Sequence, residues 1–273
     1  MTEKELEKLA RLSIDGELNK HSIEQFCKTY PDITEEEGYK AQEIRTAILE
    51  EQGYKVVGYK LGGTSLAKIQ QMKNSIYSSA GAVDKQMLIT YGRLMDYMQI
   101  PFGKDLVLDS KIHPKVEAEF AFIMKEDISG DDVTVPDVID ATEAVVPAFE
   151  IIDSRFHDFK IGRRQDALVD NTSSSGFMLG EGTIDPMKYN LNDVGMKMAV
   201  NGEYTGFGAG SSIMGHPGRA VCELVHGLAK VGKGLKKGDI ILSGAIAPSK
   251  VVKRGDYLRA DFGTFGHVEM HVI

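Results

Sequence analysis

The sequence contains no tryptophan, only two cysteines among 273 residues, and no long apolar run. A membrane-spanning helix needs about 20 mostly apolar residues, so no segment is predicted to cross a bilayer. Cys27 and Cys222 lie far apart and form no CxxC pair, which favours two reduced thiols in a cytoplasmic protein. The first residues, MTEKELEKLARL, lack the apolar stretch of a secretory signal.

Positive charge is also scarce. Lysine and arginine number 32 against 40 aspartates and glutamates, which gives a net charge of −8. An acidic surface repels a phosphate backbone, and no basic stripe with interleaved aromatic residues is present, so no nucleic-acid partner is expected. Glycine, by contrast, is abundant at 29 residues. That number exceeds the usual share of roughly 7% and favours tight turns and bulges in a sheet-rich protein.

Residues 1–53 are predicted to form a helical N-terminal arm. Four apolar or small residues recur there at helical spacing: Leu6, Leu9, Ala10 and Ser13. A second helix is predicted to begin after Thr34, because Thr34 and Glu37 have the spacing of a capping box. Gly53 is the expected stop of that helix.

Residues 54–273 have the patterns of strands and turns. Strands are predicted over 54–61, 116–124 and 144–153, the last with an edge or a bulge at Pro147. A short helix is expected over 68–72, and the stretch 73–90 fits no pattern.

Further along, Asn201-Gly202 predicts a type I′ hairpin, and residues 219–231 predict an amphipathic helix. Strands are expected to begin at Ile240 and Tyr257. No linker and no βαβ alternation is present, so the predicted fold is α+β: the helical arm and residues 54–273 as one folding unit.

Two glutamates share one face of the predicted strand 116–124. Glu117 and Glu119 are two residues apart and project together, while the same face continues with Ala121 and Ile123. Adjacent carboxylates on an otherwise apolar strand indicate a cavity, although a solvated outer face is the alternative.

Glu150 lies among apolar residues on another predicted strand, where an unpaired carboxylate is costly. Arg155 is one candidate partner for it. The other interpretation is that three carboxylates from two strands hold Mg²⁺ or Mn²⁺, which prefer oxygen ligands.

Two further polar features are open to more than one interpretation. Lys60 precedes a Gly-Gly turn and is either a surface lysine or a pocket residue that binds an anion or transfers protons. Residues 170–175 are uniformly polar and form either an ordinary turn or a set of hydrogen-bond donors that line a site.

Several segments, taken in order, resemble one family. They are Gly58-Tyr59-Lys60-Leu61-Gly62-Gly63-Thr64-Ser65, Tyr91-Gly92-Arg93-Leu94-Met95-Asp96, residues 114–120, residues 147–155, Asp170-Asn171-Thr172-Ser173-Ser174 and residues 206–217. The chain is similar over nearly its whole length to the 2-keto-4-pentenoate hydratase / 4-oxalocrotonate decarboxylase family of the fumarylacetoacetate hydrolase-like superfamily.

This resemblance implies a fumarylacetoacetase C-terminal-like mixed β-roll, a Mg²⁺ or Mn²⁺ cofactor and a small α-keto acid substrate. By position, it implies Glu117, Glu119 and Glu150 as metal ligands. It implies that Lys60, Asp96 and Ser173 are catalytic, and that Lys60, Gly62 and Ser173 bind the substrate.

The activity that the resemblance implies first is a hydratase (a lyase) acting on 2-hydroxypenta-2,4-dienoate in meta-cleavage degradation of aromatic compounds. The alternative is a 4-oxalocrotonate decarboxylase, and a third reading is a non-catalytic partner subunit. Residues 153–160 look more decarboxylase-like, whereas residues 242–248 look hydratase-like. A homo-oligomer is expected, with a hydratase–decarboxylase hetero-complex as the other possibility.

Overall fold

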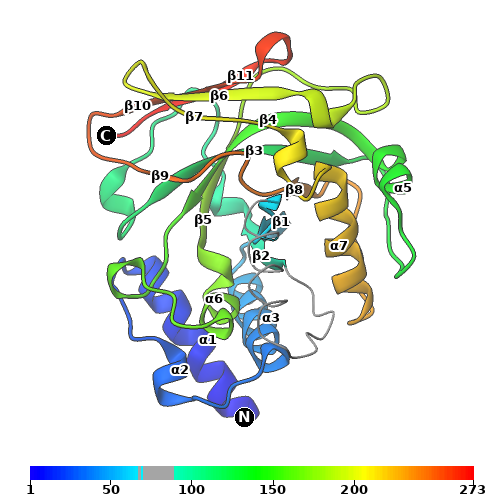
Figure 1. Ribbon diagram of the computed structural model, residues 1–273. Helices are drawn as coiled ribbons and strands as arrows, with labels where there is room; N and C mark the ends of the chain where they lie inside the picture. The colour runs from blue at the N-terminus through cyan, green and yellow to red at the C-terminus, as the bar shows by residue number, and fades with distance from the viewer. Residues whose placement is uncertain (67–68, 70–88) are drawn as a thin grey trace, which may run out of the picture.

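The computed structural model describes residues 1–66, 69 and 89–273. Figure 1 shows helices α1 (Glu3–Leu18), α2 (Phe26–Thr29), α3 (Glu35–Glu51) and α6 (Arg164–Val169) at one end of the molecule. The predicted capping box is confirmed, since the Thr34 hydroxyl accepts from the Glu37 N–H and the Glu37 carboxylate accepts from the Thr34 N–H. Gly53 follows α3 in a left-handed conformation, as expected for a helix stop.

One sheet of the described chain contains seven strands. Its order is β2 (Thr90–Met95), β1 (Val56–Gly62), β8 (Ile240–Leu242), β3 (Lys115–Met124), β4 (Thr142–Ile152) and β5 (Ser174–Leu179), with β9 (Lys250–Val251) paired to β3. The β1–β8 pair is parallel and the other pairs are antiparallel.

The second sheet lies at the opposite end of the molecule from α1–α3 (Figure 1). Its order is β11 (His267–His271), β10 (Tyr257–Asp261), β6 (Gly195–Val200) and β7 (Glu203–Ala209). The predicted hairpin between β6 and β7 is confirmed. Asn201 and Gly202 both have positive φ, 53° and 84°, which a type I′ turn requires.

Two more helices flank the sheets, α5 (Val135–Asp140) and α7 (Pro217–Ala229). The predicted inward face of α7 is confirmed, because Val221, Leu224, Val225 and Leu228 are all buried. Short 3-10 helices occupy the connections: η1 (Asp96–Met98), η2 (Leu108–Ser110), η3 (His157–Phe159), η4 (Asn171–Ser173), η5 (Leu191–Asp193), η6 (Gly210–Ser212) and η7 (Gly263–Phe265).

Strand β3 separates two hydrophobic clusters. Its predicted apolar face belongs to the main core with residues of α7 and of the second sheet: Val116, Ala118, Phe120, Phe122 and Met124. Ala121 on the other face packs in a second cluster with Leu242 and Phe177. Glu119 shares that second face, so its carboxylate projects among apolar side chains on the inner side of the curled sheet.

The expectation that Pro147 marks an edge strand is wrong, because β4 lies between β3 and β5. The ladder with β5 ends at the Ala148–Leu179 pair, and Pro147 opposes Phe120 of β3. The Pro147 carbonyl accepts from the Gly180 N–H beyond that ladder. Pro147 has no N–H to donate back on that side, and the ladder with β5 ends one residue short of it.

The two edges of the seven-stranded sheet approach each other, so the sheet curls into a roll. Gln99, just after β2, forms a parallel bridge with Phe177 of β5. The Asn171 side chain, just before β5, bonds to the backbone of Arg93 in β2. The α+β roll expected from the sequence is confirmed, and its concave face is where the candidate site lies.

The remaining expectations concern short segments and surfaces. The predicted helix 68–72, apart from Ile69, and most of the stretch 73–90 lie outside the described residues. In the described part of the chain, no helix is both long and apolar enough to cross a membrane. Cys27 and Cys222 are free thiols, as predicted.

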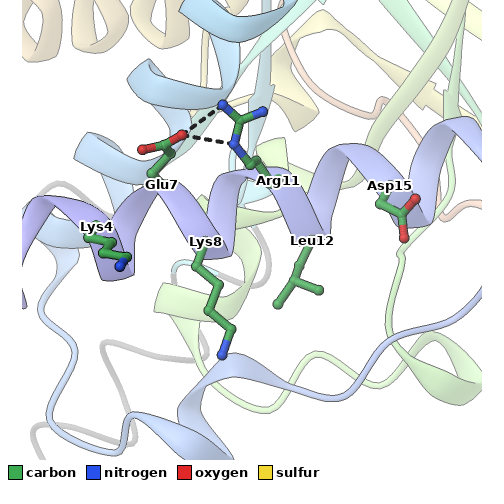
Figure 2. Close-up of a pocket in the computed structure, with 6 residues that line it drawn as sticks. All are labelled: Lys4, Glu7, Lys8, Arg11, Leu12 and Asp15. Atoms are coloured by element: carbon green, nitrogen blue, oxygen red, sulfur yellow. Dashed lines mark hydrogen bonds and ion pairs between the residues drawn. The ribbon is translucent and has the colours of Figure 1, made fainter.

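A shallow depression follows the outer face of α1 (Figure 2). Its charged residues have both signs, and Arg11 and Glu7 form an exposed ion pair at 2.7 Å. Because exposed charges of this kind are solvated and only Leu12 is apolar there, the depression lacks the convergent buried groups of an active site.

Candidate active site

Three carboxylates converge on the concave face of the roll. Strand β3 carries Glu117 and Glu119, and β4 places Glu150 directly opposite Glu117. One carboxylate oxygen from each residue lies within 4.8 Å of those of the other two. Glu119 and Glu150 are completely buried and Glu117 is half-buried. The structure thus brings together all three residues that were predicted to bind a metal.

This cluster has unmet capacity to bind a cation. Among the described residues, Glu119 Oε1 and Glu150 Oε2 have no hydrogen-bond partner, and Glu150 Oε1 lies beside the Lys60 ammonium. Glu119 Oε2 accepts from the Gly244 N–H at 2.7 Å. Burial, and then repulsion from Glu150 and Glu117, raises the pKa of Glu119 well above its usual value. Buried carboxylates with free oxygens fit a hard divalent cation such as Mg²⁺ or Mn²⁺.

Lys60 is the partner of Glu150. Its ammonium lies 3.0 Å from Glu150 Oε1, and the lysine is only 3% exposed. Burial disfavours the ammonium, but the carboxylates of Glu150, Glu117 and Glu119 outweigh burial and raise the pKa of Lys60. Lys60 is therefore a pocket residue, and its single positive charge is outnumbered by the three carboxyl groups around it.

Arg155 is not the partner of Glu150, which corrects one sequence-based interpretation. The Arg155 guanidinium donates to the Asp170 carboxylate at 2.6 Å and to the carbonyls of Asp153 and Ser174 at 2.7 and 2.9 Å. Arg155 follows β4 rather than belonging to it, so its side chain is directed at the 170–173 segment before β5. Glu150 stays on the concave face, within reach of Lys60.

The structure does not bring Asp96 together with Lys60, and its role at the substrate stays a prediction. Asp96 is exposed, and its carboxylate accepts from the N–H groups of Lys55 and Tyr97. In the β1–β2 pair, Lys60 faces Gly92, whereas Met95, just before Asp96, faces Val56. Four residues of strand separate these levels, roughly 13 Å, so Asp96 caps the far end of the hairpin.

Ser173 bonds within the 170–173 segment, and Gly62 borders Lys60. The Ser173 hydroxyl is buried and donates to Asp170 Oδ2 at 3.3 Å, and its role as a substrate-binding residue stays a prediction. A Cβ at Gly62 would lie 4.0 Å from Lys60 Nζ, so Gly62 borders the lysine directly. Its proximity follows from the two-residue spacing along β1.

The sequence patterns do not identify Gly244, although it is part of the site. Gly244 has φ of 103°, and a Cβ there would overlap the Thr64 hydroxyl. This left-handed glycine lets the segment after β8 approach Thr64 closely and aim its N–H at Glu119. The Leu242-Ser243-Gly244 sequence alone offers no signal for that contact, because it depends on the parallel pairing of β1 with β8.

The affinity for a cation is expected to depend on pH in a defined direction. Burial chiefly raises the pKa of Glu150 to about 7, so the cation-free cluster retains a proton below that pH. A bound cation must displace that proton, and its affinity should fall about tenfold per pH unit below 7. Titrating Mn²⁺ at pH 6, 7 and 8 by electron paramagnetic resonance measures this trend. Equal affinities at all three pH values, without proton release, would contradict it.

Comparison with known proteins agrees with this geometry. The model of the fumarylacetoacetate (FAA) hydrolase C-terminal family matches residues 93–273. The chain is 36% identical over 243 residues to 4-oxalocrotonate decarboxylase from Pseudomonas sp. strain CF600, covering 89% of this chain and 87% of that protein. It is 33% identical over 268 residues to 2-keto-4-pentenoate hydratase from Paraburkholderia xenovorans strain LB400, covering 98% and 95%.

Among solved structures, the fold matches 4-oxalocrotonate decarboxylase from Pseudomonas putida G7 complexed with magnesium and adipate. The TM-score is 0.91 at 32% identity, and the match covers 100% of this chain and 99% of that one. The chain therefore belongs to the fumarylacetoacetate hydrolase C-terminal family, in the group that contains the 2-keto-4-pentenoate hydratases and 4-oxalocrotonate decarboxylases.

Proposed function

We propose that the protein is a metal-dependent hydratase. It adds water to 2-hydroxypenta-2,4-dienoate (2-keto-4-pentenoate) and forms 4-hydroxy-2-oxopentanoate, as in meta-cleavage degradation of aromatic compounds. The observation that carries this proposal is the buried cluster of Glu117, Glu119 and Glu150 with Lys60 at 3.0 Å from Glu150. Similarity to a 2-keto-4-pentenoate hydratase over 98% of the chain supports it.

Each residue has a role in this proposal. Glu117, Glu119 and Glu150 would hold Mg²⁺ or Mn²⁺, and the bound cation would act as a Lewis acid on the 2-oxo group of the substrate. Lys60 holds a proton at Nζ on the concave face and is suited to transfer it between the 2-hydroxydiene and its keto tautomer. Gly62 and Ser173 are proposed to border the substrate.

A second candidate is decarboxylation of 4-oxalocrotonate (2-oxo-3-hexenedioate). The TM-score of 0.91 with a decarboxylase of that name, complexed with magnesium and adipate, favours it specifically. Both reactions build negative charge at the 2-oxo group, so Lys60 and a cation held by the three carboxylates would serve either one. The two activities must therefore be distinguished by testing the two substrates rather than from the geometry of the carboxylate cluster.

Turnover of the two substrates distinguishes these proposals. With Mg²⁺ and freshly prepared 2-hydroxypenta-2,4-dienoate, we expect loss of the diene absorbance. Chelation by EDTA should abolish the reaction, and added Mg²⁺ or Mn²⁺ should restore it. An unchanged absorbance would reject the hydratase, and CO₂ release from 4-oxalocrotonate would then assign the decarboxylase. Inactivity on both would leave the non-catalytic subunit.

The assembly and location of the protein are proposed from the same family. We propose a cytoplasmic homo-oligomer, with a hydratase–decarboxylase hetero-complex as the alternative. Light scattering on the purified chain, alone and mixed with a decarboxylase of the same source, separates the two. A single mass equal to one 30.0 kDa chain would reject the homo-oligomer.

A further inference from the structure

Two glycines flank Lys60 on its own face of the sheet. Gly92 of β2 is the direct cross-strand partner of Lys60, and Gly62 follows two residues later on β1. A cross-strand partner and a residue at i+2 both share the face of the residue that they flank. The position directly opposite Lys60 on β2 therefore holds no side chain, while a Cβ at Gly62 would lie 2.8 Å from Thr90 Oγ1 of β2.

The 170–173 turn fills the space that these glycines leave. A Cβ at Gly92 would lie 2.3 Å from the carbonyl oxygen of Asn171, and one at Gly62 would lie 3.0 Å from Thr172 Cγ2. Asn171 is fully buried and Thr172 is 9% exposed. The turn thus packs over the face from which Lys60 projects.

The turn has an unfavourable backbone. Asn171, Thr172 and Ser173 are consecutive and have φ of 51°, 52° and 57°. Asparagine tolerates this left-handed region, but the β-branched Thr172 does not adopt it readily. A backbone of this kind persists where its surroundings hold it, and such segments gather at functional sites.

The Asn171 side chain fixes the turn to β2 by hydrogen bonds. Its Oδ1 accepts from the Arg93 N–H at 2.7 Å, and its Nδ2 donates to the Arg93 carbonyl at 3.0 Å. The amide therefore replaces a neighbouring strand on the edge of β2, one residue from Gly92. The Thr172 hydroxyl adds a bond to the Tyr91 carbonyl at 3.0 Å.

We propose that Asn171 is a positioning residue for Lys60. Its two hydrogen bonds to Arg93 keep the turn seated in the space left by Gly62 and Gly92, and the seated turn restricts the Lys60 side chain to the conformation that reaches Glu150. This inference rests on the proposed function, because it assigns Asn171 an effect on catalysis through Lys60.

Replacing Asn171 with glycine tests the inference. Glycine adopts the left-handed backbone freely, so Asn171→Gly removes both hydrogen bonds without adding backbone strain. We expect kcat to fall about 10–100-fold, since small misplacements of a reacting group have effects of that size. The Mn²⁺ affinity should change less than about twofold, because the proposed metal ligands lie on β3 and β4.

A double-mutant cycle distinguishes positioning from a general structural effect. In a Lys60→Met background, Asn171→Gly should change the remaining activity less than about twofold, because the group that it positions is gone. An equal loss of activity with and without Lys60 would overturn the inference. So would a loss of Mn²⁺ affinity in step with kcat.

Asn201→Gly is the matched control. Asn201 also has a left-handed φ of 53°, and its side chain makes two hydrogen bonds of 2.8 Å, to Tyr257 and Asp256, in the β6–β7 hairpin. We expect its kcat to equal that of the wild type, and an equal loss in both variants would overturn the inference.

Gly92→Ala provides a second variant in case Asn171→Gly does not fold. A methyl group there displaces the Asn171 carbonyl from the strand side and should reproduce the loss of kcat. A Gly92→Ala protein with wild-type kcat would overturn the inference.

Oxalate binding separates failure of this inference from failure of the proposed function. Calorimetric titration of oxalate into the Mn²⁺-loaded protein needs no turnover. We expect Asn171→Gly to weaken oxalate binding about tenfold and Asn201→Gly to leave it unchanged. If the wild type converts neither substrate, this difference still supports the positioning role, whereas equal oxalate affinities overturn it.

Discussion

Replacing Glu119 with glutamine should lower the Mn²⁺ affinity at least about 100-fold and kcat on the order of 10³-fold. Residues that only hydrogen-bond to a metal ligand typically change these quantities by about 10–100-fold when mutated, so a ligand should have a larger effect. The amide is neutral, so it removes one charge from a completely buried cluster. Its oxygen can still accept from the Gly244 N–H, which preserves the local backbone. The loss should therefore reflect charge rather than disruption.

The stability of the same variant should move in the opposite direction when no metal is present. Burial raises the pKa of Glu119, and repulsion from Glu150 and Glu117 raises it further. A neutral side chain at this position avoids both the burial of a charge and the repulsion. We expect the Tm of the metal-free Glu119→Gln protein to equal or exceed that of the metal-free wild type. Saturating Mn²⁺ should stabilise the wild type by about 3 kcal/mol at 100 times its Kd, and the variant far less.

Glu143→Gln is the control for Glu119→Gln. Glu143 belongs to β4, the strand of Glu150, but it is exposed, so the same charge is removed outside the cluster. Its metal affinity and kcat should match those of the wild type. Full metal affinity in Glu119→Gln, measured by the same Mn²⁺ titration, would reject the assigned ligand.

Replacing Arg155 with methionine should cost about 3–5 kcal/mol in the free energy of unfolding, the cost typical of removing one partner of a buried ion pair. Arg155 and Asp170 are 1% and 0% exposed. The variant leaves the Asp170 carboxylate buried without its cation and leaves the carbonyls of Asp153 and Ser174 without their donor. Urea denaturation measures the change, and Tm should fall on the order of 10 °C.

Two further variants check the cause of that loss. Asp158→Asn removes an exposed ion pair with Lys160 and should change stability little, because solvent screens exposed charges. The double variant Arg155→Met/Asp170→Leu should recover part of the loss, since no uncompensated charge remains. Wild-type stability in Arg155→Met alone would contradict this account.

Features of the fold that depend on residues close in sequence could be predicted from the sequence. The capping box at Thr34, the Asn201-Gly202 turn and the inward face of α7 depend on residues close in sequence, and all three are confirmed. The same holds for Glu117 and Glu119, because alternation along one strand places both side chains on one face. That alternation predicted the central part of the candidate site before any tertiary contact was known.

The rest of the site depends on contacts between distant segments. Which cation pairs with Glu150 is decided by the curl of the sheet, so Lys60 rather than nearby Arg155 occupies that position. Strand β5, SSGFML, consists of two serines and a glycine followed by three large apolar residues, and no polar–apolar alternation in its sequence indicates a strand. The role expected for Asp96 came from resemblance alone, and strand register places Asp96 beyond the far end of β1, away from Lys60.

The parallel pairing of β1 with β8 also has a consequence for synthesis on the ribosome. Gly58 pairs with Ile240, and Glu119 accepts a hydrogen bond from Gly244. Both partners are synthesised late, so the inner face of the roll cannot be completed before they emerge. Nascent chains emerge N-terminus first at about 5–20 residues per second, so β1 and the acidic strand β3 leave the exit tunnel well before β8. On a ribosome that stalls before residue 240, the sheet therefore lacks β8, and the edges of β1 and β3 stay unpaired. Chaperones that shield such edges should bind this chain until β8 emerges.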